Sequence, residues 1–283
     1  MSDHHVISRR AAIAAGAGAA AAALTALPGT ATAAESPPAA ATGAGRKPTV
    51  VLVHGAFADA SSWAPVIGRL HRRGYDVVAP ANPLRGLRHD AAQVASVLAG
   101  VDGPVVLAGH SYCGAVITEA AGSADADVRA LVYIAAFMPD AGEVLGELSA
   151  RFPGSQLAPA LTQVPSPAPD GTPGFDLYIR PDRFHHVFAQ DVRGEVARTL
   201  AAVQRPLSAT AFGDSVNAAA WRSLPSWALI STQDRGIPAE LQRFQAERAG
   251  SHTVEVRSSH RPLHSHPDAV AGLIRSAAHH VRN

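Results

Sequence analysis

The 283-residue sequence has a single cysteine, which excludes an internal disulfide framework in any compartment. Charged residues make up only 17% of the chain, and 24 Lys and Arg nearly balance 23 Asp and Glu. There is no run of basic residues and no acidic tail, so the sequence offers no electrostatic basis for nucleic-acid binding. Beyond a weakly apolar stretch near the N-terminus, no segment is long and apolar enough to span a membrane. We therefore expect no nucleic-acid partner and no stable membrane insertion.

The N-terminal residues are typical of an export signal. The opening MSDHHVISRR ends in the pair Arg9-Arg10, an Ala- and Gly-rich stretch follows, and Ala31-Thr32-Ala33 supplies a small-residue cleavage site. Paired arginines and a weakly hydrophobic core favour the twin-arginine route, which carries folded proteins. An uncleaved anchor helix is the alternative, although Ala and Gly contribute little apolar area. We predict a signal peptide over 1–33, a flexible linker over 34–48, and a secreted or extracytoplasmic protein.

From Thr49 onward, short apolar runs alternate with amphipathic segments of helix length. This pattern is typical of a mostly parallel sheet covered by helices, so we predict an α/β domain over 49–283. The expected strands are 49–55, 75–80, 104–110, 127–137, 226–234 and 253–260, and the expected helices are 61–74, 89–100, 113–122 and 265–281.

Residues 138–224 interrupt this rhythm with a proline-rich stretch and two helical patches, 180–192 and 194–204. An insertion between two strands is a natural position for a cap over an active site, and a surface excursion is the alternative. The cap is favoured because several apolar residues would otherwise lack a core, namely Phe175, Leu177, Tyr178, Phe184 and Phe188. The aromatic residues among them indicate an apolar acyl or aryl group in the substrate.

The stretch VVLAGHSYCGAV, residues 105–116, has the form of a G-x-S-x-G nucleophile elbow in which Cys113 holds the last glycine position. Ser111 lies between an expected strand and an expected helix, with Gly109 two residues before it. Cysteine is small and Gly114 follows at once, so we expect a tight turn rather than a broken one. The Cys113 side chain should then point back into the packing. The alternative is that Ser111 merely caps the helix.

A serine nucleophile needs a base, an acid that orients the base, and donors for the oxyanion. In an open parallel sheet these groups meet at the carboxyl ends of the strands. His260 follows the last expected strand, with His264 and His266 as alternatives. Asp234 follows the preceding strand, and Asp140, after the fourth strand, is the alternative. The order Ser, Asp, His along the chain is the one that this fold uses.

The oxyanion donors are expected from two backbone amides. One belongs to Tyr112, the residue after the serine. The other belongs to Ala56 in the HGAF segment, where Gly55 lets the chain turn after the first strand. The alternative is that HGAF is only a tight turn. The histidine pairs His4-His5, His185-His186 and His279-His280 lack metal-ligand spacing. The triad and the two amides require no metal or organic cofactor, and none is expected.

Together these motifs resemble the α/β-hydrolases, and more narrowly the small-cap branch of plant methylesterases, hydroxynitrile lyases and bacterial esterases. The resemblance extends from Thr49 to the C-terminus and depends on VLVHGAF with SSW, on GHSYCG, and on STQDRGIP with SSHRPLHSHPDAV. It implies an α/β-hydrolase fold with a triad of Ser111, Asp234 and His260 and with oxyanion donors at Ala56 and Tyr112. The family usually carries glycine where this chain has Cys113.

Two positions separate the esterases of this branch from its lyases. The lyases carry a threonine after the first-strand histidine and a lysine after the catalytic histidine, where this chain has Gly55 and Arg261. Glycine matches the esterases, and arginine keeps a positive charge on a planar group unlike an ammonium. We expect Gly55, Phe57 and Arg261 to contact the substrate. The expectation is a carboxylic ester hydrolase for small-molecule esters. Its alternatives are a lyase or another cofactor-free reaction in the same pocket, and a non-catalytic ligand-binding member. The oligomeric state stays open.

Overall fold

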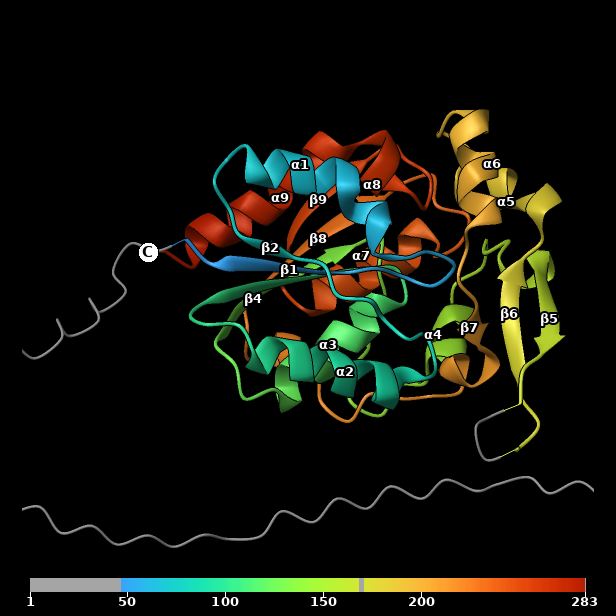
Figure 1. Cartoon of the computed structure of the whole chain (residues 1–283), viewed down its shortest axis with the longest axis horizontal. Coiled ribbons are helices and arrows are strands. Elements are labelled where there is room, and N and C mark those ends of the chain that lie inside the picture. The colour runs from blue at the N-terminus through green and yellow to red at the C-terminus, as the bar shows by residue number, and fades with distance from the viewer. Residues whose placement is uncertain (1–46, 168–170, 283) are drawn as a thin grey trace, which may run out of the picture. The chain divides into compact units, whose positions relative to one another are not determined.

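The computed structural model describes residues 47–167 and 171–282, so the expected signal peptide and nearly all of the expected linker lie outside the described residues. The described chain contains a six-stranded sheet in the order β2-β1-β3-β4-β8-β9, and all neighbouring strands are parallel. Helices cover both faces of this sheet (Figure 1). The predicted α/β class and the mostly parallel sheet are therefore confirmed.

The strands of the sheet are β1 (Thr49–Val53), β2 (Val77–Val78), β3 (Val105–His110), β4 (Val128–Ile134), β8 (Ser226–Ser231) and β9 (His252–Val256). The helices around it are η1 (Ala60–Trp63), α1 (Ala64–His71), α2 (Leu87–Ala99), α3 (Cys113–Ser123), α7 (Ala239–Arg248), α8 (Pro262–Ser265) and α9 (Pro267–His280). Each expected element is present. The second expected strand is much shorter than predicted, because only two of its residues pair with β1.

Two apolar clusters flank the sheet, one on each face. Val50 and Leu52 of β1 pack with α1 and α9, whereas Val51 and Val53 pack with α2 and α3. Successive side chains of a strand point to opposite faces, and a parallel strand covered on both sides therefore reads as one continuous apolar run. This burial fixes the strands, and with them the positions of the loops that follow their carboxyl ends.

The insertion, residues 138–224, lies between β4 and β8. Its elements are α4 (Leu145–Ala150), η2 (Ala158–Ala160), β5 (Leu161–Pro165), β6 (Phe175–Ile179), α5 (Pro181–Phe188), α6 (Gly194–Ala202), β7 (Leu207–Ser208), η3 (Ala209–Phe212) and η4 (Ala220–Arg222). The strands form an antiparallel sheet in the order β5-β6-β7, on the right of Figure 1. The two helical patches were predicted correctly as α5 and α6, but the small sheet was not predicted.

The apolar residues of the insertion differ in their burial. Leu177, Phe184 and Phe188 are buried as expected, but Phe175 is 46% exposed at the start of β6. The expectation that Phe175 needs a core was therefore wrong. It lies opposite Pro165 at the end of the small sheet, where β5 is itself largely exposed.

Candidate active site

Ser111 occupies the turn between β3 and α3 with a backbone φ of +58°, a conformation that residues with a Cβ rarely adopt. Three backbone hydrogen bonds hold it there. Its amide donates to the carbonyl of Ile134 at 3.1 Å, and its carbonyl accepts from the amides of Gly114 at 3.0 Å and Phe137 at 3.1 Å. Two of these partners belong to the end of β4 and the loop after it, so the neighbouring strand fixes the strained turn.

The glycines that this turn requires lie on either side of Cys113. A Cβ on Gly109 would lie 2.5 Å from the carbonyl oxygen of Cys113, and a Cβ on Gly114 would clash with the carbonyl oxygen of Phe137. At these two positions strand, helix and loop backbones approach too closely for any side chain. Position 113 has room for one, so the elbow keeps its positive φ with cysteine there.

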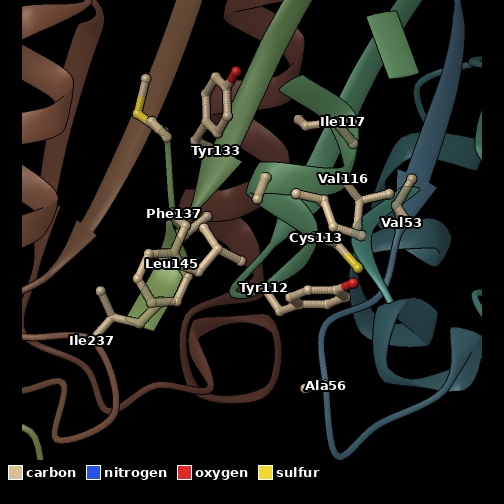
Figure 2. Close-up of a cluster of buried hydrophobic side chains, with 14 of the residues drawn as sticks. Val53, Ala56, Tyr112, Cys113, Val116, Ile117, Tyr133, Phe137, Leu145 and Ile237 are labelled. Carbon is tan, nitrogen blue, oxygen red and sulfur yellow. The ribbon is translucent and has the colours of Figure 1, made fainter. Parts of the chain in front are cut away.

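Cys113 is completely buried and lies among Val53, Val116 and Tyr112 (Figure 2). Its thiol donates to the carbonyl of His54 at 2.7 Å, and the side-chain amide of Asn82 donates to the sulfur at 2.8 Å. Burial raises the pKa of this thiol well above its ordinary value, so it stays protonated and unreactive. The expectation that the side chain points into the packing is confirmed.

Ser111, His260 and Asp234 form one hydrogen-bonded chain. The Ser111 hydroxyl oxygen lies 2.6 Å from Nε2 of His260, and Nδ1 of His260 lies 2.6 Å from Oδ2 of Asp234. The three residues are 6%, 1% and 8% exposed, respectively. They follow β3, β9 and β8, so the parallel strands of the sheet bring them to one edge. Because the Asp234 carboxylate accepts a hydrogen bond from Nδ1, the neutral imidazole carries its proton on that nitrogen. Nε2 is then free to accept the serine proton.

Four donors hold the carboxylate of Asp234. The amides of Gly236 and Ile237 donate to Oδ1 at 2.7 and 3.0 Å, and the side chain of Gln242 donates to Oδ2 at 2.9 Å. With His260 they orient both oxygens and satisfy most of the carboxylate lone pairs. The segment DRGI suggests a turn, but the part that Gln242 plays was not evident in the sequence.

The alternative acid and bases lie elsewhere. Asp140 forms an ion pair with Arg222. His266 faces Asp191 at 3.9 Å, and His264 lies 3.4 Å from the guanidinium of Arg261. In the described part of the chain, none of the three hydrogen-bonds to Ser111.

The loop after β1 comes very close to Ser111. A Cβ on Gly55 would lie 2.8 Å from the Cβ of Ser111 and 2.8 Å from the carbonyl of His110, so only glycine fits without a shift. Phe57 has a φ of +58°, which shows how sharply the loop turns. Ala56 and Tyr112 are buried, and neither amide donates a hydrogen bond to another described residue. Two free amides near a buried serine are what an oxyanion hole requires.

The insertion contributes a side chain to this site. The ring of Phe188, in α5, lies 4.7 Å from the imidazole of His260 and 6.0 Å from the ring of Phe57. The guanidinium carbon of Arg261 lies 5.6 Å from the centre of the same ring. Phe188 therefore contacts His260, the loop after β1 and Arg261 at the same time.

Several polar contacts around the site were not evident in the sequence. The Tyr112 hydroxyl donates to Asp90 at 2.9 Å, and a ring nitrogen of His110 pairs with the carbonyl of His260 at 2.8 Å. Burial lowers the pKa of His54 to about 4 and that of His110 well below its ordinary value, so both are neutral near pH 7. His54 directly follows β1 in the HGAF motif and His110 is the last residue of β3 in the GHS motif. Such positions at strand ends do not by themselves distinguish a supporting residue from a catalytic one.

A cavity of about 210 Å³ lies beside the triad. Its wall includes Phe137, Leu157, Leu161, Phe212 and Gly236, which are contributed by the insertion and by the loops after β4 and β8. Phe137 is bonded to the backbone of Ser111, and Gly236 is bonded to Asp234. The cavity is largely apolar and adjoins the triad through these two residues, while Ser111, His260 and Asp234 do not themselves line it.

Two other properties concern the described residues only. None of their helices is both long and apolar enough to cross a membrane. They also contain no cluster of three or more histidine, cysteine or acidic side chains that could hold a metal ion.

Comparison with known proteins gives a consistent result. The family model described as "Alpha/beta hydrolase family" matches residues 50–273. The chain is 27% identical to alpha/beta hydrolase nvfD of Aspergillus novofumigatus, with 82% of this chain and 97% of the relative covered. It is 28% identical to the pyrethroid hydrolase of Sphingobium wenxiniae, with 81% and 87% covered. A crystal structure of polyneuridine aldehyde esterase superposes with a TM-score of 0.70 at 21% identity, over 82% of this chain and 99% of the other.

Proposed function

The chain belongs to the alpha/beta hydrolase family and is a hydrolase, and from this premise we propose that it is a secreted serine esterase with an acyl-enzyme intermediate. One observation carries the proposal: Ser111, His260 and Asp234 are linked by two 2.6 Å contacts at the carboxyl edge of the sheet. Such a chain activates a hydroxyl that is otherwise a weak nucleophile at neutral pH.

In the first half-reaction, the Ser111 oxygen attacks the ester carbonyl while Nε2 of His260 takes the serine proton. Asp234 holds the imidazole and stabilises the imidazolium that forms. The amides of Ala56 and Tyr112 donate to the oxyanion of the tetrahedral intermediate. His260 then gives its proton to the departing alkoxide, which leaves as the alcohol, and the acyl group stays on Ser111.

In the second half-reaction, His260 takes a proton from water, and the resulting hydroxide attacks the acyl carbonyl. Collapse of the second tetrahedral intermediate returns the proton to Ser111 and releases the carboxylic acid. The chemistry is complete with these side chains and backbone amides. The close packing at Gly55 favours an esterase over a lyase of this branch, because a threonine at this position would displace Ser111 or His110.

The insertion acts as a cap in this proposal. Phe188 covers His260, and the apolar cavity beside Phe137 and Gly236 suits an aliphatic or aryl part of the ester. Apolar contacts discriminate weakly between substrates, so we expect a range of small esters to be accepted.

The test is intact-mass analysis of protein lacking residues 1–33 after treatment with a fluorophosphonate, with Ser111→Ala as the matched control. We expect one covalent adduct per chain in the parent protein and none in the variant. An unmodified, well-folded parent protein would refute the proposal and favour a ligand-binding role. Cyanide release from mandelonitrile with little ester turnover would favour the lyase.

Export by the twin-arginine route is the second part of the proposal, and it depends on Arg9-Arg10 and the cleavage site at 31–33. The measurement is cell fractionation of the full chain and of a variant with both arginines replaced by lysine. We expect a shortened protein outside the cytoplasm for the parent and an unprocessed one inside for the variant. Equal export of the two would contradict the route.

A further inference from the structure

Arg261 directly follows the proposed base, and among the residues that the structure describes this fully buried arginine has no acidic partner. It is 1% exposed. Within residues 47–167 and 171–282, Nε and Nη1 have no hydrogen-bond partner, and Nη2 reaches only Nδ1 of His264 at 3.4 Å. A buried charge is ordinarily paired, because an unpaired one is costly to remove from water. The side chain therefore has free donor capacity that the fold does not use.

The groups around Arg261 leave its charge in place. Burial, reinforced by the Arg261 charge, lowers the pKa of His264 to about 4, so this histidine is neutral. Burial lowers the pKa of Arg261 to about 10, and it remains protonated near pH 7. The charge of Asp59 raises the pKa of Arg261. The Asp59 carboxylate nevertheless accepts from the amide of Ser61 at 2.7 Å and forms no ion pair with Arg261. The result is a net positive charge inside the protein.

This charge shares an aromatic neighbour with the proposed base. The guanidinium and the imidazole of His260 both contact the ring of Phe188, with distances to its centre of 5.6 and 4.7 Å. The backbone of Arg261 is fixed at the start of α8, since its amide donates to the Ser259 hydroxyl at 3.1 Å and its carbonyl accepts from the amide of His264 at 3.0 Å. The position of the charge relative to His260 is thus set by the fold.

We propose that Arg261 determines specificity by binding a carboxylate on the substrate, so that the preferred esters carry a second, ionised carboxyl group. The inference deepens the proposed esterase function and rests on it. A guanidinium is well matched to a carboxylate through charge-assisted hydrogen bonds, and Nε and Nη1 are available for them. The apolar cavity beside Phe137 and Gly236 receives the hydrocarbon part. The substrate is then an amphiphilic half-ester or a carboxyl-bearing aryl ester.

The experiment compares matched esters with and without the extra carboxylate. One series consists of monomethyl esters of dicarboxylic acids from succinate to suberate against methyl esters of the corresponding alkanoic acids. A second series is 4-acetoxybenzoate against phenyl acetate, which places the charge on the leaving group. We expect kcat/KM to favour the carboxylate member of at least one series by about tenfold or more, the range for hydrogen bonds to charged groups.

Variants of Arg261 then assign the preference. Arg261→Gln should lower kcat/KM for the carboxylate esters by a larger factor than it lowers kcat/KM for their neutral counterparts, and Arg261→Lys should restore part of the difference. Arg257→Gln is the matched control, because Arg257 is an exposed arginine in the same loop and its loss changes the net charge equally. Arg261→Met is the control for a loss of activity that results from misfolding. Replacing an unpaired buried charge with an apolar chain of similar length should leave Tm equal or higher.

Several results would overturn the inference. These are no carboxylate preference in the parent protein, an equal fall for charged and neutral esters in Arg261→Gln, or the same loss in Arg257→Gln. The fourth would be the following combination. Chloride or phosphate changes the turnover of neutral esters, this change depends on Arg261, and the enzyme shows no carboxylate preference. Arg261 would then bind a free anion and not the substrate. Failure of the esterase proposal looks different, since then neither ester class turns over and no fluorophosphonate adduct forms.

Discussion

Replacing Cys113 with glycine, the residue usual at this position in the family, should destabilise the protein while leaving catalysis nearly intact. The substitution leaves the carbonyl of His54 and the side-chain amide of Asn82 without their present partner. Each loss is worth about 1 kcal/mol, because sulfur forms weak hydrogen bonds and the low end of the range applies. Glycine in the first turn of α3 adds about 0.5–1 kcal/mol through the entropy of the unfolded chain.

These contributions reach about 3 kcal/mol, which corresponds to a fall in Tm of about 6–12 °C for a domain of this size. The rate should change little, because the positive φ of Ser111 depends on Gly109, Gly114 and the bonds to β4, none of which the substitution touches. We expect kcat/KM per folded molecule to stay within about threefold, a change of less than about 1 kcal/mol in the barrier. Calorimetry gives Tm, and fluorophosphonate titration gives the active fraction for normalising the rate.

Two companion variants separate the contributions. Cys113→Ser keeps a donor and an acceptor at the site and should lose less stability than Cys113→Ala, which keeps neither. A Cys113→Gly protein with unchanged Tm and a much higher kcat/KM would refute the reasoning. It would mean that cysteine distorts the elbow and that its two hydrogen bonds stabilise nothing.

Two further predictions concern the proposed triad and its support. Asp234→Asn should lower kcat by about three to four orders of magnitude at unchanged fold, because an amide favours the wrong tautomer of His260; a loss below about tenfold in a steady-state ester assay would argue against this role. Burial holds the pKa of His54 at about 4 in the folded protein, whereas in the unfolded chain this histidine takes up a proton below about pH 6.5. The contribution of the neutral His54 to the free energy of unfolding is therefore complete above pH 6.5 and is lost as the pH falls to 4. In urea unfolding at pH 7 and 4.5, His54→Gln should lose less stability on acidification than the parent, by up to about 3 kcal/mol, and equal losses in the two would exclude His54 as the source.

The fold was largely predictable because its central sheet is parallel and buried on both faces. Such strands read as continuous apolar runs, and the helices between them carry amphipathic patterns. The small sheet of the insertion has neither property. Residues 161–165 of β5 are mostly exposed and end in a proline, so their pairing with β6 depends on tertiary context and left no periodic signal.

The candidate site was predictable to the extent that it depends on strand ends. Ser111, Asp234 and His260 each follow a strand, and a parallel sheet brings such residues to one edge whatever lies between them. Their partners follow no comparable rule. Gln242 reaches Asp234 from a helix, and Phe188 reaches His260 from the insertion, so both contacts depend on how separate segments pack.

The same distinction explains why two unusual residues have different consequences. Cys113 departs from the family pattern at a position where backbone contacts from β4 and two flanking glycines already determine the turn, so its side chain can vary and is used for packing. Arg261 lies where packing leaves donors unused beside the base. A side chain whose hydrogen bonds are satisfied internally affects mainly stability, whereas a buried charge with free donors affects what the site can bind. Substitutions at 113 should therefore change Tm, and substitutions at 261 should change the choice of ester.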